Sequence, residues 1–534
     1  MHRRRVLSLA LAGFAAVVSA CSPGPQRAKD ALAIADSWEP RSLDPLVLQG
    51  TQVALVNNLL FSYLLDVDNA GDPVPEVALA VPTLRNGGIS ADGKTIRYRL
   101  RRDVRWSDGV PLTARDAAYT FAAIADPRNA AASRYGYDLV ASVAAPTDDT
   151  LIVRMKRPFS PIVSTFLAPG GNYPILPAHV LRGAGPIDRS PFAVRPVGSG
   201  PFAVARWDRG DAMTLERNEY FVAQPAIESI HWKFVPSPQT MVSQLRTGEV
   251  DAVFGASPSL LPQLRSLPGH RIVVTPVAGM AQWEFNTTDP VVGDVRVRRA
   301  LAMAVDWPRV VSRATEGNYA AAGAMRGVFG WSYDPGVRYP SSDQRGAAAL
   351  LAAAGWLPGP GGVRRKNGAP LEVSVAIPAD EDTLLRVLTQ VQSAEATVGV
   401  RLIPHVIAKS LYKSFEGPIN QGRFQSGMDR FAADPDPDPS WLVGCDHRAP
   451  NGFNRARYCN AAVDAAIADA TATYDQVRRT RDYAVVQAAI ARDVPFYPIY
   501  QDREIDVVPL RLRGFVPSTQ DLPLQGVQRW SLAP

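Results

Sequence analysis

The most unusual chemical feature of this 534-residue sequence is a run in which three aspartates alternate with prolines, Asp434-Pro435-Asp436-Pro437-Asp438-Pro439. Alternating carboxylates are typical of a calcium-binding loop, but that loop also needs glycine at its sixth position and glutamate at its twelfth. Pro439 and Cys445 occupy those positions and exclude the calcium loop. The run is either a solvated proline-rich loop or a carboxylate site, and a carboxylate site favours a cationic or zwitterionic ligand.

Signatures of catalysis and of metal binding are missing from the rest of the sequence. There is no HExxH, no GxSxG and no Walker loop, and the turn at Gly198-Ser199-Gly200 lacks the final glycine and the helix of a dinucleotide site. No two histidines have the spacing of metal ligands; the six are His2, His179, His231, His270, His405 and His447. We therefore predict a protein that is not an enzyme and that carries no cofactor and no metal.

The first twenty residues have the composition of a secretory signal peptide. Three arginines at positions 3–5 precede an apolar run, residues 6–18, that is too short to span a bilayer. The residues Val18-Ser19-Ala20-Cys21 resemble the lipobox of bacterial lipoproteins, in which the cysteine is acylated and becomes the new N-terminus. We predict a signal peptide over residues 1–20 and a lipidated tether over residues 21–30. The alternative is an ordinary signal peptide with a chance cysteine.

The two remaining cysteines, Cys445 and Cys459, flank a loop that is rich in Asn, Arg and Gly. Their spacing excludes a CxxC redox motif and a zinc site. Because an exported compartment permits disulfides, we predict that these two cysteines form a bridge. The alternative is a pair of free thiols.

Length and composition predict a large folded body. A chain of 534 residues is too long for one core and indicates two or three domains. The 46 prolines and 40 glycines fall below the level that suggests disorder. The net charge of +6 includes the three signal-peptide arginines, and acidic residues are interspersed, so we expect no nucleic-acid partner. After the signal, no segment has the length and apolarity of a transmembrane helix, which predicts a soluble body held at a membrane surface.

Local patterns predict the elements that must position these residues. Ile96, Tyr98 and Leu100 alternate with charged residues, as in a half-buried strand, and the alternation resumes at Val104 and Trp106.

Capping residues indicate where three helices begin, namely Thr113, Asp294 and Asp343. Apolar residues of the second helix share one face, and we expect its arginines to lie off that face; they are Arg296, Arg298 and Arg299.

The C-terminal half contains the pattern of a parallel sheet. Residues 371–377 alternate as a strand, residues 384–391 have helical spacing, and residues 400–406 again read as a strand. Strand, helix and strand in this order predict a right-handed crossover unit. Two further helices are expected around residues 463–470 and 483–490.

A series of short motifs then follows one order along the chain. The motifs are Ser42-Leu43-Asp44-Pro45, the stretch 100–116 around Trp106-Ser107-Asp108-Gly109, Gly198-Ser199-Gly200-Pro201-Phe202, the stretch 245–251, Phe285-Asn286, the stretch 294–301, and Asp438-Pro439 before Trp441. Together they resemble the family 5 extracellular solute-binding proteins, the peptide- and nickel-binding group that includes the oligopeptide and dipeptide binders. The resemblance covers nearly everything from about residue 31 to residue 530.

The resemblance implies an α/β protein with the two-lobed periplasmic-binding-protein type II fold (cluster C). An extra small domain and a hinge belong to this fold, and closure about the hinge encloses the ligand. We expect lobe 1 to comprise residues 31–62, 186–285 and 502–534, the small domain residues 63–185, and lobe 2 residues 286–501.

The resemblance also implies ligand-binding residues. In the resembling peptide binders an aspartate just before the Asp-Pro element accepts the peptide's terminal ammonium. The proline spacing differs here, so Asp434 or Asp436 takes this role, and we favour Asp434. Gln49 and Thr51 are expected to run beside the peptide backbone, unless Thr51 merely begins a helix. Trp283 is expected either to wall the cleft or to lie in the core.

The implied function is capture of di- or oligopeptides by a monomer that delivers them to the permease of an ABC importer. Its implied partners are the permease subunits and, through them, the ATPase subunits. A lipid anchor would hold it at the cell envelope, in the periplasm or on the outer face of the cytoplasmic membrane. Alternative ligands within the family are an oligosaccharide, an opine or a metal chelate. A lipid-anchored hydrolase and a structural lipoprotein are disfavoured, because the sequence has neither a nucleophile–base constellation nor repeats.

Overall fold

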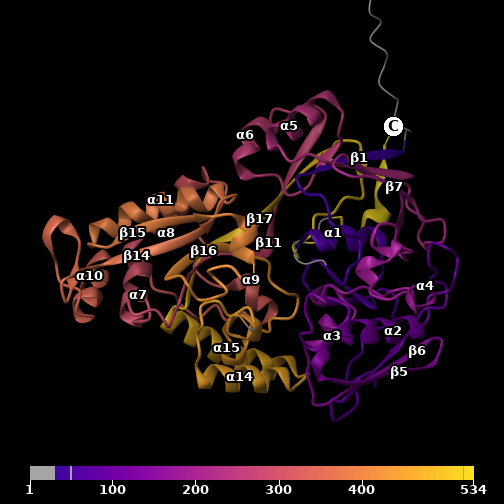
Figure 1. The fold of residues 1–534 in the computed structure, drawn as a ribbon, viewed down its shortest axis with the longest axis horizontal. Helices are drawn as coiled ribbons and strands as arrows, with labels where there is room; N and C mark the ends of the chain where they lie inside the picture. Colours follow the sequence, from indigo (N-terminus) through magenta and orange to yellow (C-terminus); the bar gives the residue numbers. More distant parts are fainter. Residues whose placement is uncertain are drawn as a thin grey trace, which may run out of the picture.

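The computed structural model describes residues 30–47, 51–414, 416–450, 452–520, 522 and 524–533. Two α/β lobes stand side by side, and a small domain extends below one of them (Figure 1). The predicted signal peptide, the tether with Cys21, and Gln49 lie outside the described residues. No helix among those described is both long and apolar enough to cross a bilayer.

One mixed sheet runs through both lobes. Its ten strands, in spatial order, are β15 (Arg401–Ile407), β14 (Glu372–Pro378), β16 (Ser426–Phe431), β11 (His270–Phe285), β17 (Phe496–Pro509), β10 (Ala252–Val253), β1 (Ala31–Asp36), β9 (Ser229–Phe234), β8 (Ala212–Arg217) and β7 (Phe202–Asp208). The strands from β15 to β16 belong to lobe 2, and those from β10 to β7 belong to lobe 1.

The long antiparallel strands β11 and β17 connect the lobes. Residues 270–276 of β11 pair with β17 beside lobe 1, whereas residues 280–284 pair with both β16 and β17 in lobe 2. The pairing register shifts between Pro276 and Met280, which is typical of a bend in the ladder. The bend lies where β11 passes from its pairing beside lobe 1 to its pairing in lobe 2.

Lobe 1 and the small domain share one continuous hydrophobic core. This core runs from Leu32 of β1 through Tyr98 and Trp106 of the small domain to Trp530 near the C-terminus. Shared burial of this kind makes the two parts one packed unit. The helices of lobe 1 are α1 (Thr51–Leu60), α5 (Pro238–Thr247) and α6 (Leu261–Leu264), and a short pair of strands near its C-terminal end is β18 (Leu512–Arg513) with β19 (Ser531–Leu532).

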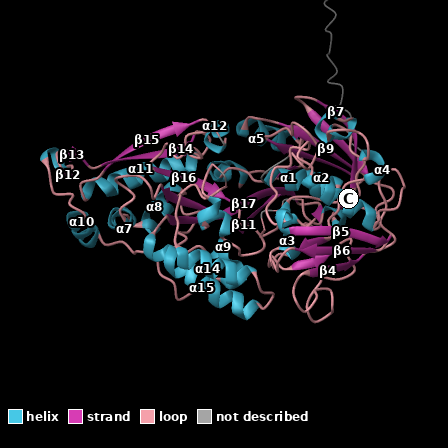
Figure 2. Ribbon diagram, turned by 60° about the horizontal axis from the view of Figure 1, so that its bottom comes forward, coloured by secondary structure: helices cyan, strands magenta, loops and turns pink. Residues whose placement is uncertain are grey.

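The small domain is built on a three-stranded antiparallel sheet, whose strands lie one below another in Figure 2. Its elements are β2 (Leu65–Val67), β3 (Pro73–Pro75), β4 (Thr95–Arg99), α2 (Ala114–Ala125), β5 (Val140–Thr147), β6 (Thr150–Met155), α3 (Ile162–Thr165) and α4 (Ala178–Leu181). The predicted helix start is confirmed, because Asp116 accepts a hydrogen bond from the amide of Thr113 at 2.7 Å and forms a capping box. Val104 and Trp106 are buried but belong to no strand, so the second part of the predicted strand is wrong.

Lobe 2 contains the predicted crossover unit. Strand β14, helix α11 (Asp382–Thr397) and strand β15 follow one another, and the two strands pair in parallel. Asp294 and Asp343 cap α7 and α10 as predicted, each accepting a bond from a backbone amide of the first turn. The remaining elements are α7 (Val295–Ala304), α8 (Trp307–Ala314), α9 (Arg326–Phe329), α10 (Gln344–Ala353), β12 (Arg365–Lys366), β13 (Ala369–Pro370), α12 (Lys409–Lys413), α13 (Ser440–Val443), α14 (Ala461–Thr471) and α15 (Gln476–Asp493).

Arg298 of α7 corrects the prediction that the arginines of this helix lie off its buried face. Its side chain is buried, and the guanidinium donates hydrogen bonds of 2.7–3.1 Å to the carbonyl oxygens of Val292, Gly293, Asp493 and Val494. Two of these carbonyls lie at the C-terminal end of α15, where a cation stabilises unpaired acceptors. The arginine therefore joins α7 to α15.

Candidate ligand-binding site

A cavity of about 640 Å³ lies between the small domain and lobe 2. Its volume falls within the range of pockets that enclose small ligands, roughly 300–1,000 Å³. The small domain contributes Ala132, Ser133, Arg134, Tyr135, Tyr137, Asp138, Thr165, Gly170, Gly171, Asn172 and Tyr173, and lobe 2 contributes Phe431, Ala432, Asp434, Trp441, His447, Gly452 and Phe453.

The small-domain wall is held by buried contacts. The Tyr173 hydroxyl donates to the carbonyl oxygen of Ser133 and accepts from its amide, both at 2.7 Å. A Cβ atom on Gly171 would lie 2.0 Å from the carbonyl oxygen of Thr165, so only glycine fits there. The amide of Ala132 donates to the carbonyl oxygen of Leu46 at 2.9 Å, which ties this wall to lobe 1.

Asp434 is the aspartate of the Asp-Pro run that lines the cavity. Water reaches its carboxylate from the cavity, yet protein surrounds the site. Desolvation by the protein atoms around this cavity-exposed carboxylate, followed by the nearby negative charge of Asp436, raises the pKa of Asp434 to about 7. The free site thus holds a carboxyl group that a cationic ligand group would stabilise in its ionised form.

The other two aspartates of the run have partners inside the protein. Asp436 is buried and accepts a hydrogen bond of 2.6 Å from Arg479 of α15, in an ion pair away from the cavity lining. Asp438 accepts a bond from the amide of Ser440 at 3.0 Å and another from the hydroxyl of Tyr135. The three carboxylates therefore have three different environments, and only that of Asp434 faces the cavity.

Contacts across the cleft bring the small domain against lobe 2. The ring of Tyr135 packs edge-on against His447, with ring centroids 6.0 Å apart. The amide of Ser160 donates to the carbonyl oxygen of Thr471 at 2.7 Å, and the hydroxyl of Tyr474 donates to that of Phe159 at 3.3 Å. These contacts join the small domain to lobe 2.

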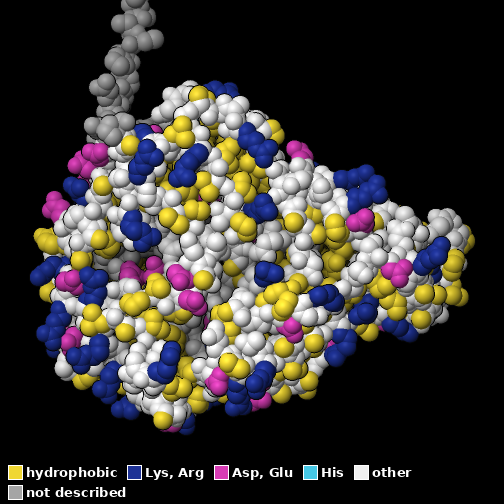
Figure 3. All heavy atoms as spheres, turned by 180° about the vertical axis from the view of Figure 1, so that it is seen from behind, with side chains coloured by type: hydrophobic (Ala, Val, Ile, Leu, Met, Phe, Trp, Pro, Cys, Tyr) yellow, Lys and Arg dark blue, Asp and Glu magenta, His cyan; other side chains and the backbone are white. Residues whose placement is uncertain are grey.

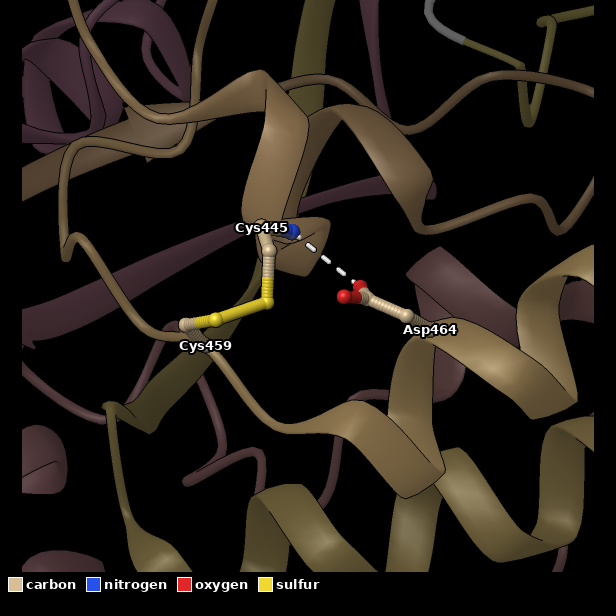
Figure 4. A group of neighbouring side chains, drawn as sticks. All are labelled: Cys445, Cys459 and Asp464. Atoms are coloured by element: carbon tan, nitrogen blue, oxygen red, sulfur yellow. Dashed lines mark hydrogen bonds between the residues drawn. A yellow bond between two sulfur atoms is a disulfide. The ribbon is translucent and has the colours of Figure 1, made fainter.

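The loop between Cys445 and Cys459 carries three of the lining residues. The structure joins the two sulfur atoms at 2.08 Å, and the carboxylate of Asp464 accepts a hydrogen bond of 3.1 Å from the amide of Cys445 (Figure 4). In the described parts of the chain, these three residues are the one group of His, Cys, Asp and Glu close enough to share a metal ion. Because the sulfurs are bonded to each other, they offer no thiolate to a metal.

Trp283 lies in the core of lobe 2, which is the second of the two places expected for it, and not at the cleft wall. Its side chain is 0% exposed and packs against Phe285 and Trp307, with ring centroids 4.9 and 6.3 Å away. Odd-numbered residues at this end of β11 face the lobe 2 core, as alternation along a strand requires. Thr51 is the first residue of α1, in agreement with the alternative that it begins a helix.

Several lining residues were not identified from the sequence. Six of them carry a Tyr, Phe or Trp ring, and the exposed or half-buried residues among these six are Tyr135, Phe431, Trp441 and Phe453. Phe431 and Trp441 flank the Asp-Pro run, and their rings lie 5.7 Å apart. Their position in the sequence, on either side of the acidic run, could have indicated that Phe431 and Trp441 line the same site as Asp434.

Comparison with known proteins gives the same architecture. Residues 72–453 match the family described as bacterial extracellular solute-binding proteins, family 5. Protein XP55 of Streptomyces lividans is 28% identical over 497 residues, which are 91% of this chain and 87% of that protein. The oligopeptide-binding protein AppA of Bacillus subtilis is 23% identical over 516 residues, 95% of this chain and 92% of that protein.

Solved structures share the fold over almost the whole chain. AppA of Bacillus subtilis in complex with a nonapeptide has a TM-score of 0.81 at 21% identity and covers 94% of this chain and 99% of its own. NikZ of Campylobacter jejuni in complex with Ni(L-His) has a TM-score of 0.82 at 22% identity and covers 95% of this chain and 100% of its own. The chain therefore belongs to the family 5 bacterial extracellular solute-binding proteins, the substrate-binding components of ABC importers, and has their two-lobed type II fold.

Proposed function

We propose that this protein captures short peptides in the cavity between the small domain and lobe 2 and delivers them to the permease of an ABC importer. The permease would pass them inward with the energy of its ATPase subunits. The protein itself performs no chemistry on the peptide. We also propose that Cys21 carries a lipid that anchors the protein at the membrane, on the strength of the signal-like residues before it.

The position of Asp434 carries the proposal for a peptide. The charged side chains among the described lining residues are those of Arg134, Asp138 and Asp434, together with the titratable His447. Arg134 donates its hydrogen bonds to backbone carbonyl oxygens of its own domain. Asp138 and Asp434 are the two carboxylates of this lining, one on each wall, and a peptide ammonium at Asp434 would gain a charge-assisted hydrogen bond on the lobe 2 wall.

Two ligand classes are known among proteins of this fold, since AppA was solved with a nonapeptide and NikZ with Ni(L-His). A carboxylate in an aromatic cavity suits a ligand that carries one amine and apolar groups, as a free peptide does. The surface also fits a solute importer better than a nucleic-acid binder, because lysines and arginines are scattered over the face in Figure 3.

Calorimetric titration of the purified full-length protein with free and N-acetylated tripeptides tests the proposal. Hydrogen bonds to charged groups contribute about 1.5–3 kcal/mol, so acetylation should weaken binding by roughly tenfold to a hundredfold or more. Asp434→Asn should lose a similar amount for the free peptide and should no longer distinguish it from the acetylated one.

Asp436→Asn is the matched control, because it removes the charge from the neighbouring aspartate that pairs with Arg479. We expect this variant to be less stable but still to prefer the free peptide. Equal affinity of the unchanged protein for both peptides would exclude ammonium capture by Asp434. Binding of nickel–histidine or of an oligosaccharide, with no binding of any peptide, would overturn the proposed ligand class.

A further inference from the structure

Phe453 presents a large apolar side chain to the cavity. It lines the cavity with 44% of its surface exposed, while Leu442, Val443 and Tyr458 in the same part of lobe 2 are buried. A single exposed apolar residue is common on protein surfaces and by itself carries no function. Phe453 differs because it lies in a ligand cavity and because the two residues that follow it are bonded to the rest of lobe 2.

The residue after Phe453 fixes the loop from inside. Asn454 is fully buried. Its side-chain nitrogen Nδ2 donates hydrogen bonds to the carbonyl oxygens of Gly444 at 2.9 Å and Tyr458 at 2.8 Å. Its side-chain oxygen accepts from the amide of Tyr458 at 3.2 Å. These bonds close the loop 445–459 around Asn454, next to the point where the two cysteines join its ends.

The following residue ties the loop to the sheet. Both terminal nitrogens of Arg455 lie 3.1 Å from Oδ2 of Asp429 on β16, and its Nε lies 3.4 Å from Oε2 of Glu284 on β11. Both carboxylates are 1% exposed. If the loop moved away from the sheet, these buried carboxylates would lose their cationic partner and remain uncompensated. The ion pairs therefore strongly favour one position of the loop.

We infer that Phe453 selects ligands with a large apolar side chain, and that the anchored loop holds it ready for that contact. The inference rests on the proposed function, because it names the class of peptide that the same cavity prefers. A rigid aromatic ring gains contact area without paying for the ordering of a mobile side chain. Trp441 and Phe431 are half-buried beside the same cavity, so an apolar ligand side chain would meet several aromatic surfaces.

Titration of the purified full-length protein with trialanine and with the three tripeptides that replace one alanine by phenylalanine tests this inference. We expect at least one phenylalanine peptide to bind about tenfold or more tightly than trialanine. Phe453→Ala should reduce this ratio toward one. Phe453→Leu keeps an apolar side chain and should lower the ratio by less.

Tyr220→Ala is the matched control, since Tyr220 is an aromatic residue of similar exposure, 45%, that does not line the cavity. It should leave the ratio unchanged. An unchanged ratio in both Phe453 variants, with trialanine still bound, would overturn the selectivity inference and leave the proposed function intact. Failure of the unaltered protein to bind any of the four peptides would instead count against the proposed function itself.

Discussion

The hydroxyl of Tyr135 in the small domain donates a hydrogen bond to Oδ2 of Asp438 in lobe 2 and lies 2.8 Å from Oγ of Ser440. Asp438 is 4% exposed, and burial raises the pKa of its carboxyl group. A buried carboxylate is costly in free energy unless donors bind it. The bond from Tyr135 therefore stabilises the arrangement in which the small domain contacts lobe 2. The contact lies at the rim of the cavity, because Tyr135 also lines it.

Tyr135→Phe should therefore shift the protein toward an open arrangement of its lobes. The variant keeps the ring against His447 and removes one bond to a charged group, about 1.5–3 kcal/mol. We expect peptide affinity to fall by roughly tenfold or more and the radius of gyration of the ligand-free protein to rise in small-angle scattering. Tyr220→Phe, at an exposed site outside the cavity, is the control. Unchanged affinity and unchanged scattering would show that the bond does not stabilise closure.

The Cys445–Cys459 bridge should stabilise the folded protein. Closing a loop of about fifteen residues contributes roughly 3 kcal/mol to the free energy of unfolding in the chain-entropy account. The double variant Cys445→Ser/Cys459→Ser should lose about this amount in denaturant unfolding. Intact mass after alkylation under denaturing conditions measures the bridge directly. Two alkylated thiols in protein that has not been reduced would rule it out.

Cys21→Ser should release the protein from the membrane fraction. One acyl chain binds a bilayer only marginally, so stable attachment requires the several chains of a lipoprotein. Fractionation of cells that express each form, followed by immunoblotting, gives the distribution. Equal recovery of both forms in the membrane pellet would refute the lipobox interpretation.

The helix starts could be predicted because their signals are local. Asp294 and Asp343 each accept a bond from an amide of the first turn that follows, and the amide of Thr113 donates to the carboxylate of Asp116, so each cap and its partner lie in one short stretch. Arg298 could not be placed in the same way. Its burial depends on carbonyl oxygens of Asp493 and Val494, which lie 195 and 196 residues further along the chain.

Within the candidate site, the sequence shows the acidic run and does not show the partners of its aspartates. The Asp-Pro run is conspicuous, and resemblance to peptide binders favoured Asp434 within it. The separate roles of the neighbouring aspartates depend on Arg479 and on Tyr135, which lies 303 residues from Asp438, and no local pattern encodes those partners. Trp283 was ambiguous because strand alternation does not tell which face of β11 packs into the core.

Glu395 of α11 should make the protein less stable as the pH rises. It is 0% exposed, both carboxylate oxygens lack a hydrogen-bond partner among the described residues, and burial raises its pKa well above the usual range. Because the folded pKa exceeds the unfolded one, its favourable contribution is complete below about pH 4.5 and is lost as the pH rises through the folded value.

Glu395→Leu should therefore raise the melting temperature, by an amount that grows between pH 5 and pH 8. Removing an unpaired buried polar group is worth about 1–3 kcal/mol. Glu219→Leu, which removes the same group from an exposed position, is the control and should leave the pH dependence unchanged. Parallel melting curves of the Glu395 variant and the unaltered protein across this pH range would contradict the assignment of an unpaired buried carboxyl.

Peptide affinity should fall as the pH drops below the pKa of Asp434, which desolvation and the charge of Asp436 raise to about 7 in the free site. An ammonium binds the ionised carboxylate, so the bound site has a lowered pKa and the full affinity is present above pH 7. At pH 5 only about 1% of a carboxyl with pKa 7 is ionised, so affinity should be lower by up to about a hundredfold. Asp434→Asn has no such carboxyl and should bind with the same weak affinity at both pH values. Calorimetric titration at half-unit steps from pH 5 to pH 7.5 gives the slope. The same slope in both proteins would assign the titration to another group and exclude Asp434 as the ammonium acceptor.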